Sequence, residues 1–214
     1  MKRPTQIIIA LTLIAVATVL VVRHFGRGVP IIPTPQFDVL GGIAAEEVAK
    51  LLSRQGRVVV VVFDATDFGV ARLDGAVAQF RKTSSAAGLQ TLAVETIRCK
   101  LGEQTLPARV AAVLRKHAGA DALVTFGPAY GLRAGDVAGW GTPLPKWVSV
   151  LTFDSDPGTL KKLFQSGAVQ TAITIRSEEG ASAGAAGPAN APFVVLTPAT
   201  ADALVVPGDG IPDE

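Results

Sequence analysis

Residues 58–63 (VVVVVF) form an uninterrupted run of β-branched and aromatic side chains, with no polar residue between them. A strand with this pattern is apolar on both faces, so an exposed face would leave several valines in water. Parallel sheets with helices on both faces bury such strands completely. The run therefore predicts a central strand of a parallel sheet that lies between two helical layers.

The residues around this run alternate between helical and extended patterns, and Gly follows most of the helical ones. Helices are expected over 39–55, 70–87, 106–118 and 159–166, and strands over 58–63, 89–97, 121–126, 147–153 and 169–175. Gly56 is expected to end the first helix in a left-handed conformation. Alternating units of this length predict an α/β fold with a single doubly wound, mostly parallel five-stranded sheet of the Rossmann-like type, spanning 36–177.

The N-terminal segment has a different character. Residues 7–22 (IIIALTLIAVATVLVV) carry no charge and have basic residues on each side. As a helix this run is roughly 24 Å long, and flanking cations can reach the headgroups of a hydrocarbon core of ~30 Å. We expect residues 1–27 to be an uncleaved transmembrane helix, with the rest of the chain exported to the periplasm or cell exterior. A signal peptide cleaved after 15–17 (AVA) and a buried core helix are the alternatives.

Two further segments flank the expected domain. Residues 28–35 (GVPIIPTP) contain three Pro, which favours an extended linker. Residues 178–214 contain six acidic residues and no Lys or Arg, and their first part is rich in Gly and Ala. We expect an acidic tail there, with an edge strand at 193–197.

Composition and motifs exclude several function classes. The one cysteine, Cys99, excludes an internal disulfide framework and a Cys-rich zinc site, and two His leave little for a histidine cluster. A net charge of +2 and 6% aromatic residues give no support for nucleic-acid binding. No Gly-rich phosphate loop follows the first strand and no G-x-S-x-G motif occurs. We therefore predict a non-enzymatic protein with no cofactor.

Ligands of doubly wound sheets bind at the carboxyl ends of the strands. Asp64 follows the first expected strand, Tyr130 the third, Asp154 the fourth and Arg176 the fifth. These residues are the candidates for ligand contacts at that edge. Asp64 and Asp154 could also hold a divalent metal in a hydrolase, but Asp at such positions commonly caps helices or stabilises turns.

Several short segments also match a known pattern in the same order. They are the helix 42–56 with its Ala and Leu spacing, 71–75 (ARLDG), 120–124 (ADALV), 150–154 (VLTFD) and 160–169 (LKKLFQSGAV). Together they resemble the C-terminal lobe of type I periplasmic sugar-binding proteins of the ribose-binding kind. The resemblance implies that Arg72 and Asp154 hold sugar hydroxyls. A guanidinium donates hydrogen bonds in pairs and a carboxylate accepts them, which suits vicinal hydroxyls.

The chain departs from that family at two ligand positions and in extent. A family Asn is replaced around Pro128, a family Gln becomes Arg176, and residues 1–35 do not provide the N-terminal lobe. We therefore expect a membrane-anchored module that binds or senses a sugar or sugar acid, as in ABC transport. A partner protein or a second copy would supply the other wall of the cleft. The alternative is a structural or protein-interaction domain of a cell-envelope assembly, with a vestigial cleft.

Overall fold

The computed structural model describes residues 34–65, 73–99, 106–127, 132, 134–137, 140, 143–150, 157–175 and 193–201. The chain divides into two units, Met1–Ile32 and Pro33–Glu214, and all of the described residues belong to the second. The strands are β1 (Gly56–Asp64), β2 (Leu89–Arg98), β3 (Ala122–Phe126), β4 (Lys146–Val150), β5 (Val169–Ile175) and β6 (Phe193–Leu196). The helices are α2 (Thr34–Leu51), α3 (Asp74–Ala86), α4 (Leu106–Lys116), α5 (Ala134–Val137), α6 (Pro157–Gln165) and α7 (Pro198–Ala201).

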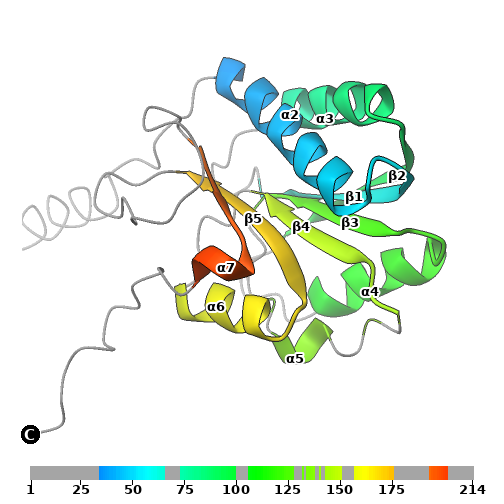
Figure 1. Cartoon of the computed structure of the whole chain (residues 1–214). Helices are drawn as coiled ribbons and strands as arrows, with labels where there is room; N and C mark the ends of the chain where they lie inside the picture. The colour runs from blue at the N-terminus through cyan, green and yellow to red at the C-terminus, as the bar shows by residue number, and fades with distance from the viewer. Residues whose placement is uncertain are drawn as a thin grey trace, which may run out of the picture. The chain divides into compact units, whose positions relative to one another are not determined.

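These strands form a single mixed sheet in the order β2-β1-β3-β4-β5-β6 (Figure 1). The first five pair in parallel, as the sequence predicts. The predicted total of five strands is wrong, because Phe193–Leu196 pairs antiparallel with β5 as a sixth strand. This strand confirms the edge strand expected at 193–197, since β6 ends the strand order. Phe193, Val194 and Leu196 are buried, so the segment belongs to the domain core.

Helices cover both faces of the sheet, with α2 and α3 on one side and α4, α5 and α6 on the other (Figure 1). The side chains of alternate β1 residues point towards the two helical layers. Val59, Val61 and Phe63 join a cluster with Val110 and Leu114 of α4. Val58 and Val60 are fully buried on the opposite face. The valine run is thus the central strand that the sequence predicts.

Helices α2 and α3 approach each other very closely. An added Cβ at Gly41 of α2 would lie 2.0 Å from the carbonyl oxygen of Ala76 in α3, so only glycine fits there. On its sheet side, α3 packs Phe80 edge-on against Phe126 of β3, with ring centroids 5.8 Å apart. These contacts hold α3 over the middle of the sheet and leave part of β2 on the same face uncovered.

The boundaries of α2 differ from the sequence prediction. The helix begins at Thr34, so the last two residues of the expected linker are helical, and Pro35 lies in the first turn, where proline is tolerated. It ends at Leu51, and the left-handed residues that follow are Ser53 and Arg54, with φ of 53° and 63°. Gly56 instead begins β1. The prediction that Gly56 ends this helix is therefore wrong.

No helix among the described residues combines the length and apolar character needed to cross a bilayer. The anchor expected at 1–27 and the first part of the linker lie outside those residues, as does most of the segment 178–214. The membrane anchor therefore stays a prediction.

Candidate functional site

The carboxyl ends of β1 and β2 lie side by side at one corner of the sheet. Asp64 pairs with Arg98 in the parallel ladder, and Val62 pairs with Thr96. Because side chains two residues apart on a strand share a face, all four project to the side of the sheet that carries α3. A carboxylate and a guanidinium therefore stand next to each other on adjacent strands.

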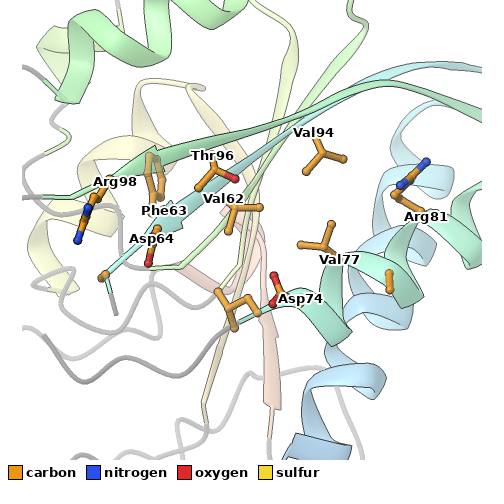
Figure 2. Close-up of a pocket in the computed structure, with 12 residues that line it drawn as sticks. Val62, Phe63, Asp64, Asp74, Val77, Arg81, Val94, Thr96 and Arg98 are labelled. Atoms are coloured by element: carbon orange, nitrogen blue, oxygen red, sulfur yellow. The ribbon is translucent and has the colours of Figure 1, made fainter. Parts of the chain in front are cut away.

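A groove of about 640 Å³ runs between this part of the sheet and α3 (Figure 2). Its floor includes Val62, Val94, Thr96 and Arg98 of the two strands. Its wall is the stripe of α3 formed by Asp74, Val77, Ala78 and Arg81, which recur at the three- and four-residue spacing of one helix face. The groove is thus the space left where α3 does not cover the edge strand.

The polar end of this groove suits a polyhydroxylated ligand. Asp64 and Asp74 present carboxylates, which accept hydrogen bonds, and Arg98 presents a guanidinium, which only donates them. The hydroxyl of Thr96 can do both. A set of paired acceptors and donors on adjacent strands matches neighbouring hydroxyl groups, each of which donates one hydrogen bond and accepts others.

Of the ligand contacts predicted from the sequence, Asp64 lies in the groove. Arg72, Tyr130, Asp154 and Arg176 fall outside the described residues, so their roles stay predictions. The structure adds groove residues that the sequence reasoning missed: Asp74, Thr96 and Arg98. One signal was present for Arg98, since it directly follows the second predicted strand and the carboxyl ends of neighbouring parallel strands lie together.

The carboxyl end of β3 carries no side chain. Gly127 has φ of +99°, and an added Cβ would lie 2.8 Å from the carbonyl oxygen of Phe63. Its amide donates a hydrogen bond to the carbonyl oxygen of Val150, with an N···O distance of 3.0 Å. The backbone packing at Gly127 therefore leaves no room for a side chain at this position. Side-chain contacts in the described groove therefore come from β1, β2 and α3.

A second charged cluster lies on the opposite face of β2. Glu95 Oε1 accepts a hydrogen bond from Lys116 Nζ at 2.7 Å and lies 2.9 Å from His117 Nε2 at the end of α4. Lys116 and then His117 lower the pKa of the Glu95 carboxyl from its usual 4.5. His117, which directly follows α4, thus lies within hydrogen-bond distance of the same carboxylate oxygen that binds Lys116. Within the described ranges, no three His, Cys, Asp or Glu side chains are placed to hold a metal ion.

The chain is similar to solved structures of sugar-binding proteins, including solute-binding proteins of ABC transporters. An arabinose-binding protein from Geobacillus stearothermophilus is 18% identical with a TM-score of 0.57, over 79% of this chain and 63% of that one. A solute-binding protein from Agrobacterium vitis, bound with α-D-tagatopyranose, is 21% identical with a TM-score of 0.55, over 76% and 57%. A substrate-binding protein of a sugar transport system from Bordetella parapertussis is 15% identical with a TM-score of 0.55, over 83% and 62%.

These similarities establish the periplasmic binding protein fold, which confirms the resemblance drawn from the short sequence segments. The chain matches less than two thirds of the length of each of these proteins. No protein-family model matches the sequence, and no curated protein does.

Proposed function

We propose that this protein is a non-enzymatic module that binds a sugar or sugar acid at the carboxyl edge of its sheet. One observation carries the proposal: the Asp64–Arg98 neighbours open onto a groove in a domain with the fold of sugar-binding proteins. The solved neighbours include an arabinose-binding protein and one bound with tagatose.

Further contacts are proposed from the family resemblance. Arg72 precedes α3 in the sequence and Asp154 follows β4, and the resemblance implies that both contact the ligand. Tyr130 and Arg176 follow β3 and β5 in the same way. The arginines would donate hydrogen bonds to a ligand, and the carboxylates of Asp64, Asp74 and Asp154 would accept them. The opposite charges offset each other, so this set suits a sugar or a sugar acid.

The proposed module acts with a second protein surface and at a membrane. The groove is open on one side, so a ligand that occupies it keeps part of its surface in water, and tight capture needs a second wall. A partner protein or a second copy of this chain would supply that wall. The apolar run at 7–22 supports anchoring of the chain in a membrane, with the domain exported.

Sugar-dependent stabilisation tests this function. Thermal unfolding of the purified full chain would be followed with L-arabinose, D-ribose, D-tagatose, D-galactose and D-galacturonate. A ligand present at about 100 times its dissociation constant raises the free energy of unfolding by about 2.7 kcal/mol. We expect at least one of these sugars to raise the melting temperature, and Asp64→Asn and Arg98→Gln to abolish the shift.

Matched control variants are available away from the groove. Arg57→Gln removes an exposed arginine at the start of β1, and Glu46→Gln removes an exposed carboxylate on α2. Both should keep the full sugar response. The proposal fails if none of these sugars shifts the melting temperature at millimolar concentration, or if Asp64→Asn and Arg98→Gln respond like the controls. A stoichiometric protein partner that is insensitive to sugars would then favour the role of a protein-interaction domain.

A further inference from the structure

We propose that the groove takes a glycoside, that is, a sugar that carries an apolar substituent with a negatively charged end. This inference rests on the proposed sugar-binding function and names the chemical class of ligand at the same site. It follows from the order of side chains along the groove, from its polar end to its far end.

The groove extends well beyond the hydroxyl-binding end. Figure 2 shows Asp64 and Arg98 at one end, Val62, Val77 and Val94 in the middle, and Arg81 at the other end. From Arg98 back to Val94 is four residues of strand, or about 13 Å, and from Asp74 to Arg81 is seven residues of helix, or about 10 Å. The volume of about 640 Å³ is in the range of pockets that hold drug-sized ligands, which are larger than one sugar ring.

The middle of the groove is apolar. Val94 is 38% exposed, and Val62 and Val77 are half-buried beside it. None of these side chains can hydrogen-bond a hydroxyl. An apolar substituent placed over the valines would remove their methyl groups from water, and that burial is favourable in proportion to its area. A second sugar ring placed over the valines would contribute less binding free energy, because its hydroxyl groups would find no hydrogen-bond partner there.

The far end of the groove carries a positive charge. The guanidinium of Arg81 is exposed and forms no hydrogen bond or ion pair with the part of the chain that the structure describes. A carboxylate at the end of the apolar substituent would pair with it in the bidentate geometry that arginine favours. Asp74 lies on the same helix face, two turns nearer to the sugar end, so the negative charge is best tolerated at the far end.

Binding of matched glycosides tests the inference. Calorimetry of the full chain would compare the free sugars with the methyl, phenyl and 4-carboxyphenyl glycosides of D-glucose, D-galactose and L-arabinose. For the sugar that binds best, we expect the phenyl glycoside to bind about tenfold more tightly than the methyl glycoside, because of the added apolar contact. The 4-carboxyphenyl glycoside should bind several-fold more tightly again.

Three variants separate the contribution of the apolar contact from that of the carboxylate. Val94→Ser should remove most of the phenyl advantage, and Arg81→Gln should remove only the advantage of the carboxylate. Val39→Ser is the matched control, because Val39 is a valine on α2 that is 56% exposed and does not line the groove. It should leave all affinities unchanged.

The outcomes distinguish this inference from the function on which it rests. Equal binding of methyl and phenyl glycosides, or a phenyl advantage that survives Val94→Ser, overturns the glycoside inference and leaves sugar binding intact. Absence of binding by all the glycosides, together with absence of a thermal shift for every sugar in the test of function, overturns both. Binding of phenol and benzoate as tight as that of the glycosides also overturns it, since the groove would then recognise only the apolar part.

Discussion

The two faces of strand β2 differ although they belong to the same ten residues. On one face, Ile97 is 3% exposed and packs in the core cluster beneath α4, and Glu95 is paired with α4 residues. On the other face, Val94, Thr96 and Arg98 line the open groove. Ile97 of this strand is therefore buried towards α4, whereas the alternate residues face the groove beside α3. The groove therefore arises from the position of α3 over the sheet and not from a special feature of β2.

The contact between α2 and α3 explains this placement. Gly41 lets the backbone of α3 come within van der Waals distance of α2, and Phe80 anchors α3 on β3. Both contacts draw α3 towards the centre of the sheet and away from its edge. On the opposite face, the buried apolar side chains of α4, which include Leu106 and Val110, pack in the cluster that contains Ile97. One helix layer thus covers the edge strand and the other leaves it open.

The largest expected effect contrasts the two faces directly. Ile97→Ala should lower the free energy of unfolding by about 3 kcal/mol, because it leaves a cavity beneath α4. Val94→Ala should lower it by less than about 1 kcal/mol, since this side chain already contacts solvent. Urea unfolding of the full chain measures both. Equal losses for the two variants would show that both faces of β2 are packed in solution.

A smaller effect on the free energy of unfolding tests whether the close contact between α2 and α3 sets the position of α3. Gly41→Ala should lower the free energy of unfolding by about 2 kcal/mol, because its methyl group would overlap the carbonyl of Ala76 and push the helices apart. Gly42→Ala is the matched control, with no atom within 4 Å of the added Cβ. This control should raise stability by up to about 1 kcal/mol through helix propensity. If the two variants unfold at the same urea concentration, the close approach of α2 and α3 is wrong.

The smallest effect concerns the charged cluster on the α4 face. Lys116 and His117 lower the pKa of Glu95, so folding favours its ionised form. This stabilisation is complete above the unfolded value of about 4.5 and is lost as the pH falls through the lower folded pKa. Glu95→Gln should cost about 0.5 kcal/mol at neutral pH. The cost should disappear at low pH in urea unfolding across pH 2–8, whereas a pH-independent cost would contradict the ion pairing.

The sequence predicted the topology well because hydrophobic patterns report on burial. The run 58–63 indicated a strand buried on both faces, and five of its six residues are buried. The exception, Val62, is half-buried and lies in the groove. The place where the pattern fails is therefore the candidate site. No local pattern distinguishes Val62 from its neighbours, because its exposure depends on where α3 lies.

The composition of the site was only partly predictable for a similar reason. Asp64 could be identified because it directly follows a clear strand, and the carboxyl ends of such strands form ligand sites. Thr96 and Val94 could not, because their roles follow from the register of β2 against β1 and from the position of α3, which leaves them uncovered among the described residues. The edge strand at 193–197 was expected, but its place as the sixth strand was not, because four residues carry no information about their antiparallel partner β5.

Gly127 has a consequence for any redesign of this protein. An added Cβ at residue 127 would lie 2.8 Å from the carbonyl oxygen of Phe63, and φ there is +99°, so a side chain introduced at the end of β3 would be strained. Attempts to alter ligand preference by engineering should start from the edge strand, at Val94 and Thr96, where substitutions meet solvent and not backbone. Ligand specificity can thus be changed by substitutions in the edge strand β2, while the end of β3 stays unaltered.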